Sequence, residues 1–373
     1  MIKKLITCGL FLDFSKAFDT VDHNILLQKL QKYGIRGTTL TWFENYLTNR
    51  KQFVKIKDIE SEMLTIKCGV PQGSTLGPIL FLLYINDLPN SSDKLLFRIF
   101  ADDTNIFFAH EKSKELENIM KQEFEKVLRY CAINKLSINF KKTNYMVIST
   151  KRITPIVNIP NIQQITHIKY LGVYIDDKLN WNIHIKHVNS KVAKNIGILY
   201  KLRPYLNLKT LKQIYYSLIY PYLYYAILSW GNTYKSRLTK IITKQNKAVR
   251  AIFYANSRES AKPLYKLLHI LPFLDLFKLK TALLTYTIIN KPADIPKPFQ
   301  NYFSLASNTH QYNTRFSHKQ NFIRPRIRTN YGMHTFAFMS SQIWETIPET
   351  LKRIKSLTSF KHHYKLFLIN QKY

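Results

Sequence analysis

Acidic residues, glycine and cysteine are all scarce in this chain of 373 residues. It holds 23 Asp and Glu side chains against 56 Lys and Arg, so its formal net charge at pH 7 is +33 and its pI is about 9.9. A protein so short of negative charge is expected to bind a polyanion, either nucleic acid or an anionic membrane surface. Its length and its 46% hydrophobic residues allow two or three domains with a real core.

The three cysteines, Cys8, Cys68 and Cys131, lie far apart in the sequence. Their spacing excludes a zinc knuckle and gives no disulfide framework, which indicates a reducing compartment. The apolar run that follows Met1–Lys4 is short and ends at Asp13, so we expect no secretory signal. We therefore expect a protein of the nucleus or cytoplasm that is not secreted.

Long apolar segments are also scarce, and Ile214–Trp230 is the one candidate for a membrane span. This segment has no charged residue, but it contains Pro221 and is rich in tyrosine, which prefers the membrane interface to the bilayer centre. We expect a buried pair of helices here and no membrane partner.

The shortage of acids is uneven along the chain. Residues 1–150 hold 21 basic and 16 acidic side chains, whereas residues 151–373 hold 35 and 7. The net charge is therefore +5 in the first segment and +28 in the second. This distribution suits a protein whose acids do chemistry in the first segment and whose second segment binds the phosphates of nucleic acid. The alternative is a lysine-rich surface that is merely solvated.

Two adjacent carboxylates, Asp102 and Asp103, lie between the apolar runs Leu95–Phe100 and Ile106–Ala109. This pattern predicts a strand, a tight turn that carries both acids, and a returning strand. A third acid, Asp13, ends another apolar run. Acids at the ends of buried strands need a cation, and Mg²⁺ prefers carboxylate oxygens and substrate phosphates. Paired ions of this kind hold the oxygens of phosphoryl transfer in polymerases.

We therefore predict that Asp13 and Asp102 bridge metal ions from two neighbouring strands. Asp103 falls on the opposite strand face by period, so the pattern leaves its metal contact open. The pair Asp176 and Asp177 also follows an apolar run, but its surroundings indicate ordinary turn chemistry. Asp19 and Asp22 precede a helical pattern and are interpreted as capping or structural acids.

Three of the ten glycines, Gly69, Gly73 and Gly77, fall within nine positions. Such clustering indicates a place where the backbone approaches a ligand closely, although a structural loop before a helix is the alternative. Hydrophobic periodicity predicts strands at 5–14, 145–149 and 168–175, a hairpin at 53–66, and helices at 26–33, 40–47, 78–88 and 113–131. Helical patterns dominate 183–290 and close the chain at 333–369, and 291–330 is predicted to be a linker or an extended arm.

Three segments, in this order, resemble the palm motifs of reverse transcriptases from non-LTR retrotransposons, the long interspersed, jockey-like elements. They are Phe11–His23, Gly69–Pro78 with its continuation Phe81–Leu88, and Phe100–Thr104. The resemblance covers residues 1–180 in detail and continues more loosely through Leu199–Arg250 and the basic tail.

The resemblance implies an α+β fold with the right-hand architecture of a polymerase. Residues 1–180 would form a palm, an antiparallel sheet with packed helices and partial fingers. Residues 181–290 would form a helical thumb-like region, and residues 291–373 a basic C-terminal region. The thumb helices would lie along the minor groove of the template–primer duplex and contact phosphates. The thumb resemblance is clearest at Trp230-Gly231 and Gln245–Arg250, and Trp344–Pro348 resembles a motif of the C-terminal region.

The implied activity is RNA-directed DNA synthesis with two Mg²⁺ ions, or Mn²⁺ in their place. A primer 3′-hydroxyl would attack the α-phosphate of a deoxynucleoside triphosphate on an RNA template, and pyrophosphate would leave. The resemblance gives Asp103 a catalytic role beside Asp13 and Asp102. Lys142 fits the lysine that protonates pyrophosphate, and its neighbour Lys141 stays an alternative.

Further site residues follow from the resemblance alone. Phe18 would pack against the sugar of the nucleotide and reject a 2′-hydroxyl. Gln72 and Gly73 would contact the nucleotide and the template. The primer 3′ end would meet a hairpin formed by Tyr170, Leu171 and Gly172.

Only 12 residues precede Asp13, where the family carries amino-terminal fingers that hold the triphosphate. We therefore expect an amino-terminally truncated copy with impaired synthesis. Two alternatives stay open: a catalytically silent remnant that still binds nucleic acid, and a fragment with no stable fold.

Overall fold

The computed structural model of the chain describes residues 5–149, 155–296, 299, 302–303, 321–327 and 329–371. It divides into two compact units. The first comprises 1–169 and 176–179, and the second comprises 170–175 and 180–373. The division into a thumb at 181–290 and a separate region at 291–373 stays a prediction.

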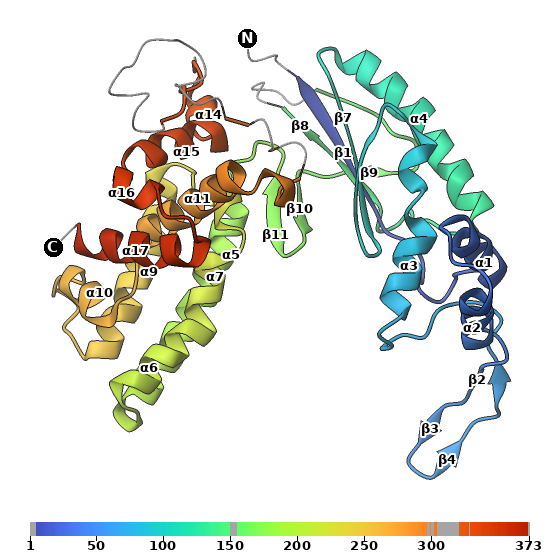
Figure 1. Cartoon of the computed structure of the whole chain (residues 1–373), viewed down its shortest axis with the longest axis horizontal. Helices are drawn as coiled ribbons and strands as arrows, with labels where there is room; N and C mark the ends of the chain where they lie inside the picture. The colour runs from blue at the N-terminus through green and yellow to red at the C-terminus, as the bar shows by residue number, and fades with distance from the viewer. Residues whose placement is uncertain are drawn as a thin grey trace. The chain divides into compact units, whose positions relative to one another are not determined.

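The first unit is an α+β domain, and Figure 1 shows its elements from blue to green. Its strands are β1 (Ile6–Leu12), β2 (Lys51–Gln52), β3 (Lys55–Ile56), β4 (Ile59–Glu60), β5 (Leu64–Thr65), β6 (Leu96–Phe100), β7 (Asp103–His110), β8 (Asn144–Ile148) and β9 (Gln163–Gln164). Its helices are α1 (His23–Lys32), α2 (Thr38–Leu47), α3 (Gly77–Ile85), the short η1 (Leu88–Ser91) and α4 (Ser113–Ile133).

Strand β1 lies at the centre of a five-stranded sheet with the order β6-β7-β1-β8-β9. It pairs antiparallel with β7 from Ile6↔His110 to Leu12↔Thr104, and with β8 on its other side. Its apolar side chains are almost completely buried, as a run of this kind requires. The expected antiparallel sheet is confirmed for four strands, whereas β9 adds to β8 in parallel.

Helices cover this sheet and complete the core of the first unit. Helix α4 packs against β7 and β1, and α1 packs against α2 and α3 (Figure 1). Fully buried side chains such as Leu10, Phe81 and Val127 join the two layers. The predicted helices at 26–33, 40–47, 78–88 and 113–131 are confirmed as α1 to α4, with ends shifted by a few residues.

The hairpin predicted at 53–66 is confirmed as an arm made of two short ribbons. Strand β2 pairs with β5, and β3 pairs with β4 at the tip of the arm. The whole arm is exposed, and it projects from the rest of the first unit (Figure 1).

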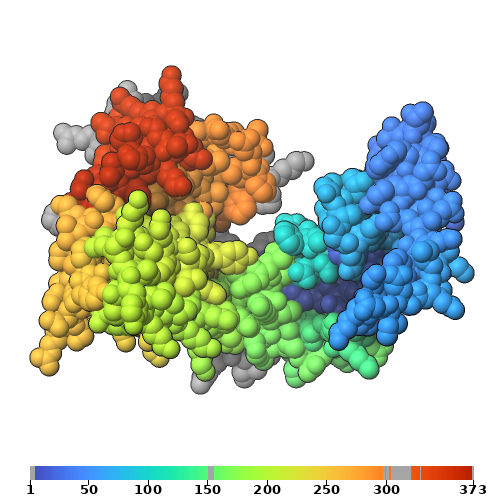
Figure 2. Space-filling model, turned by 90° about the horizontal axis from the view of Figure 1, so that it is seen from below, coloured from blue at the N-terminus to red at the C-terminus, as the bar shows by residue number. Residues whose placement is uncertain are grey.

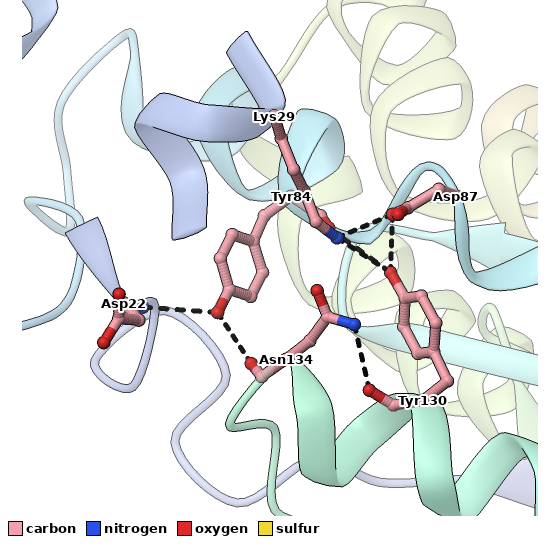
Figure 3. Close-up of polar contacts among 6 residues, drawn as sticks. All are labelled: Asp22, Lys29, Tyr84, Asp87, Tyr130 and Asn134. Atoms are coloured by element: carbon pink, nitrogen blue, oxygen red, sulfur yellow. Dashed lines mark hydrogen bonds and ion pairs between the residues drawn. The ribbon is translucent and has the colours of Figure 1, made fainter. Parts of the chain in front are cut away.

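A polar network joins α1, α3 and α4 inside the first unit (Figure 3). The Lys29 ammonium donates to the Tyr84 carbonyl at 2.6 Å, to Asp87 Oδ1 at 2.7 Å and to the Tyr130 hydroxyl at 3.0 Å. The Tyr84 hydroxyl donates to the Asn134 carbonyl at 2.6 Å. Burial lowers the pKa of Lys29, and the hydrogen bond that Lys29 donates to Asp87 opposes that shift.

The acids that precede α1 take different roles. Asp22 caps the helix, because its side chain accepts the Ile25 N–H at 3.0 Å, and it pairs with Lys135 at 2.6 Å. Asp19 caps nothing and accepts a hydrogen bond from Gln72 at 2.7 Å. The interpretation as capping or structural acids is therefore confirmed, since Asp22 caps the helix and Asp19 makes a structural contact.

The second unit is mostly helical. Its elements are α5 (Asn182–Leu202), η2 (Arg203–Tyr205), α6 (Leu208–Ile214), the π-helical turn η3 (Tyr215–Ile219), α7 (Tyr220–Tyr224), α8 (Ile227–Trp230), α9 (Lys235–Phe253), α10 (Lys262–Leu268), α11 (Phe273–Asn290), η4 (Pro292–Asp294), α14 (Asn330–Met333), α15 (Phe336–Glu345), α16 (Glu349–Lys352) and α17 (Leu357–Asn370). The predicted linker at 291–330 falls largely outside the described residues.

The motif residues of this unit lie in its core. Trp230 is completely buried and stacks on Phe273 at 5.2 Å between ring centroids. The buried Gln245 amide donates to the Tyr215 hydroxyl and the Leu271 carbonyl and accepts the Phe273 N–H. Trp344 is buried near Phe360, so the C-terminal motif has a packing role. In the described ranges no helix is long and apolar enough to cross a membrane.

The single strand that alternation predicted at 168–175 is wrong, whereas the hairpin that the resemblance implied at Tyr170, Leu171 and Gly172 is present. Residues 168–175 form a hairpin of β10 (His167–Tyr170) and β11 (Val173–Asp176) and not one strand. Leu171 and Gly172 have φ values of +43° and +80°, which reverse the chain. Alternation of apolar side chains cannot reveal such a turn when an apolar residue occupies it. Asp176 does take turn geometry as predicted, since its side chain accepts the Lys178 N–H at 3.2 Å.

Replacing Lys29 with Met should destabilise the first unit by about 1–3 kcal/mol, because Asp87 and the Tyr84 carbonyl lose their cationic partner. Chemical denaturation measures this change in the free energy of unfolding. Lys32→Met removes a charge from an exposed site on the same helix and should change stability by less than about 0.5 kcal/mol. Equal effects of the two substitutions would show that the network contributes nothing.

Candidate active site

The predicted carboxylates gather at one end of the paired strands β1 and β7. Leu12 pairs with Thr104, so Asp13 continues the register opposite Asp103. The Asp13 N–H donates to the Thr143 hydroxyl at 3.2 Å, and its carbonyl accepts the Asn139 N–H at 2.8 Å. These bonds hold the backbone of Asp13 directly after the buried strand, and the Asp13 side chain is half-exposed there.

Asp102 lies in the two-residue turn that joins β6 to β7. Phe100 pairs with Asp103 across this turn, and Ala101 has a φ of +52°. A positive φ is uncommon for a residue with a side chain, and such conformations concentrate at functional sites. The predicted strand–turn–strand is therefore confirmed, and Asp102 and Asp103 are both exposed at its end.

The three carboxylates influence one another electrostatically. Burial raises the pKa of Asp103, and the negative charges of Asp102 and Asp13 raise it further. Mutual repulsion of this kind is what a bound cation would relieve. Hard carboxylate oxygens suit Mg²⁺ or Mn²⁺ in chemistry. Among the residues that the structure describes, however, no three such side chains form a preformed metal cluster.

Lys142 lies in a turn that is attached to Asp13. Ser15 donates to the Ser137 carbonyl at 2.8 Å, and Asn139 donates to the Asp13 carbonyl, so residues 137–143 follow the end of β1. Both Lys141 and Lys142 are exposed in this turn. Sequence reasoning missed the buried Thr143, whose hydroxyl accepts the Asp13 N–H, and a polar residue next to a lysine pair gives no signal of that role.

The glycine loop folds against the segment that follows Asp13. Gly69 donates to the Val21 carbonyl at 2.7 Å, and Val70 donates to the Phe18 carbonyl at 2.8 Å. Gly69 has a φ of +94°, and a Cβ there would lie 2.8 Å from the Asp19 carbonyl oxygen. The clustering of glycines therefore reflects close approach of two backbone segments at this position.

The residues predicted to meet the nucleotide border this contact. The Phe18 ring is half-buried and packs on Phe81 with 4.8 Å between ring centroids. Gln72 is exposed and donates to Asp19, while Gly73 is exposed with open space around it. Phe18, Gln72 and Gly73 thus share one loop system of the first unit with Asp13.

Tyr170, Leu171 and Gly172 belong to the second unit and form the hairpin turn there. The Tyr225 hydroxyl donates to the Leu171 carbonyl at 2.5 Å, and a Cβ on Gly172 would lie 3.3 Å from the Tyr225 ring. The Trp230 indole N–H in turn donates to the Tyr225 carbonyl at 3.0 Å. Sequence reasoning missed Tyr225, because one tyrosine in a tyrosine-rich segment carries no distinguishing mark.

Comparison with known proteins gives this site a class. Residues 2–175 match the family described as reverse transcriptase (RNA-dependent DNA polymerase). With carboxylates at the ends of paired palm strands, this segment is a reverse transcriptase domain. Residues 2–175 thus belong to the reverse transcriptases, a family that in general uses divalent metal ions, and the chain is similar to the polymerases of non-LTR retrotransposons.

Two relatives come from Drosophila melanogaster. The probable RNA-directed DNA polymerase from transposon X-element is 31% identical over 260 residues, which are 65% of this chain and 28% of that protein. The RNA-directed DNA polymerase from mobile element jockey is 31% identical over 286 residues, which are 71% of this chain and 31% of that protein. The chain thus spans less than a third of the length of either relative.

A solved telomerase from Candida albicans, in complex with a fragment of telomeric RNA, aligns with 71% of this chain and 51% of its own at 12% identity. The TM-score of 0.38 is low, so the family assignment depends on the sequence matches. None of these comparisons favours a silent remnant over a polymerase domain.

Asp103→Asn should stabilise the first unit at neutral pH by less than about 1 kcal/mol, since the site is open to solvent. The raised pKa means that the folded chain holds the Asp103 proton more tightly than the unfolded chain does. Stability should therefore fall as pH rises from the ordinary carboxyl pKa through the raised value, and the substitution should remove this fall. Thermal melts across pH measure this pH dependence of stability, and Asp93→Asn, at an exposed site, is the control. An equal change of the pH dependence in the two variants would contradict mutual repulsion among the three carboxylates.

Tyr225→Phe should loosen the turn at Leu171 and Gly172, because the carbonyl of Leu171 loses its donor. Loss of one such bond should speed amide exchange in residues 170–174 about two- to tenfold. Hydrogen exchange with mass spectrometry measures the effect. Tyr205→Phe, at a highly exposed tyrosine of the same unit, should leave these amides unchanged. Unchanged exchange in the Tyr225 variant would mean that backbone pairing alone holds the turn.

Proposed function

We propose that this chain carries the catalytic domain of an RNA-directed DNA polymerase. The observation that supports it best is the register of β1 and β7, which sets Asp13 opposite Asp103 with Asp102 in the adjoining turn. Three acids of this kind, in a domain of this family, suit nucleotidyl transfer.

In the proposed reaction, a primer 3′-hydroxyl attacks the α-phosphate of a deoxynucleoside triphosphate, and the bond to pyrophosphate breaks. Two Mg²⁺ ions, or Mn²⁺, would lower the pKa of the hydroxyl and neutralise the leaving oxygens. Asp13, Asp102 and Asp103 would hold these ions. Lys142, or Lys141 beside it, gives a proton to the pyrophosphate that leaves.

The remaining site residues select and position the substrates. Phe18, fixed by its contact with Phe81, forms a wall against the nucleotide sugar and disfavours a 2′-hydroxyl. Gln72 contacts the nucleotide, and Gly73 leaves room for the templating base. The turn at Tyr170, Leu171 and Gly172 contacts the primer end.

The partners we propose are an RNA template, a DNA primer and deoxynucleoside triphosphates. Helices α5 and α9 carry much of the positive charge of the second unit, and they would bind the phosphates of the template–primer duplex. Reverse transcription needs an RNA template, so we place the protein in the nucleus or cytoplasm.

Asp102→Asn should reduce incorporation of labelled deoxynucleotide on a primed RNA template at least about a hundredfold, because a ligand of the metal ions is lost without a change of shape. Binding of the same template–primer, measured without nucleotide, should stay within about twofold. Asp177→Asn is the matched control from a turn acid pair and should keep full activity. Synthesis that survives Asp102→Asn would refute this site.

A further inference from the structure

The second unit contains an apolar groove of about 910 Å³ that the proposed reaction does not use. Its walls come from the segment between α8 and α9, from α9 and α11, and from α14 and α15. All of these elements belong to one compact unit, and α15 packs directly on α11 (Figure 1). We call it the α11–α15 groove, and its lining includes Gly231, Leu238, Phe277, Met333, Met339 and Ile343.

Two motifs that the polymerase mechanism leaves without a role meet at this groove. Gly231 belongs to Trp230-Gly231, and Thr346 belongs to Trp344–Pro348; both line the groove although they lie far apart in the sequence. A Cβ on Gly231 would lie 2.9 Å from Cδ2 of Phe277, so the glycine lets the segment before α9 approach α11 closely. The tryptophans of these motifs are buried in the core, and their neighbours shape the groove.

The groove has a buried floor and an adaptable edge. Leu238, Phe277 and Ile343 are almost completely buried and form the floor. Met333 is 48% exposed and Met339 is half-buried, so two flexible thioether side chains border the open side. Methionine packs against apolar shapes of many kinds, which is why it is frequent on surfaces that bind amphipathic helices.

The end of the groove at α14 is fixed by contacts within the unit. The Asn232 amide donates to the His334 carbonyl, and the His334 ring contacts the Asn232 carbonyl through Nδ1. The rings of Tyr234 and His334 pack edge to face with 4.5 Å between centroids. These contacts tie α14 to the segment before α9, so the groove is formed without a ligand. A preformed groove loses little free energy to ordering when a ligand binds.

The lining carries positive charge and no carboxylate. Apart from histidine, Lys235 and Lys278 are the only ionisable cations among its described residues. Lys278 pairs with the buried Asp275 at 3.2 Å, whereas Lys235 is exposed and forms no ion pair within the described ranges. An occupant with acids beside its apolar side chains would therefore complement the groove and the basic unit around it.

These features favour one class of occupant. A nucleic acid strand carries a phosphate at every residue, and the apolar floor cannot pair with phosphates. A second copy of the chain is disfavoured, because two proteins of net charge +33 repel each other. An amphipathic helix with apolar residues at intervals of three and four fits a groove between helices, and acids on its flanks would meet Lys235.

We infer that the α11–α15 groove binds an acidic amphipathic helix of a partner protein. The apolar side chains of that helix would lie on Phe277, Met333 and Met339, and its carboxylates would lie beside Lys235. The groove would then join the polymerase domain to another protein, a role that lies beyond nucleotidyl transfer and does not depend on it.

Selection from a random library tests the inference on the full chain. Surface-displayed random peptides are sorted for binding to the fluorescently labelled chain, without nucleic acid or divalent metal. We expect the enriched peptides to have net negative charge and apolar residues at intervals of three and four. The Kd of one enriched peptide is then measured by fluorescence anisotropy with the wild-type chain and with the variants below.

Substitutions at the open edge test the apolar contact. Met333→Glu places a carboxylate at this edge and should raise the Kd at least about tenfold. Tyr331→Glu is the matched control, because this side chain is 44% exposed on the same helix and lies outside the lining; it should change the Kd by less than about twofold. Met333→Ala should raise the Kd about three- to tenfold, and it keeps the test decisive if Met333→Glu does not fold.

Charge substitutions on α9 test the electrostatic contact. Lys235→Glu should raise the Kd about two- to tenfold and reduce its dependence on salt, because charges at the border of an interface act mainly on association. Lys240→Glu makes the same change of charge at an exposed position outside the lining and should have the smaller effect on both quantities.

Three results would overturn the inference: no enriched peptide with this pattern, equal effects of the Met333 and Tyr331 substitutions, or equal effects of the two lysine substitutions. Oleate is the probe for a lipid, and binding of oleate without binding of any peptide would also overturn it. Peptide binding should persist in Asp102→Asn. Failure of the polymerase proposal is therefore distinguishable from failure of this one.

Discussion

The double pairing of β1 is the constraint on which the first unit depends. With β7 on one side and β8 on the other, this strand cannot shift in register without moving its buried side chains to the wrong face. The same pairing places the end of β1 beside the end of β7, so two acids meet where burial stops. The turn at residues 137–143 then fixes the backbone of Asp13 through Thr143 and Asn139. Fold and candidate site thus share one set of hydrogen bonds.

Sequence reasoning succeeded where a pattern is local. The alternation around Asp102 and Asp103 predicted β6, the turn and β7, and helical periodicity predicted α4 within two residues. It failed where a structure depends on a contact between residues far apart in the sequence, because hydrophobic periodicity does not reveal such contacts. Thr143, Tyr225 and Gln72 each act through partners that only the folded chain brings near, and the turn at Leu171 has an apolar residue where a polar one is usual. The site was predictable as a set of residues, and its supporting contacts were not.

The second unit shows how motif residues can serve packing. Trp230 and Gln245, the marks by which this region resembles a thumb, lie in its core and join α8, α9 and α11. The basic side chains of α9 stay outside that core. These motif residues therefore maintain a scaffold, and the basic side chains of α9 lie on the surface that this scaffold supports.

Strand β6 forms one edge of the five-stranded sheet among the described residues, and this edge has a cost for handling the protein. Its unpaired backbone groups, flanked by the exposed Leu96 and Phe100, can template a strand from a neighbouring molecule. Arg98 lies in the middle of β6, and its charge among apolar residues disfavours such pairing. Replacing Arg98 with a neutral residue would leave an exposed apolar edge strand, which would favour aggregation during refolding.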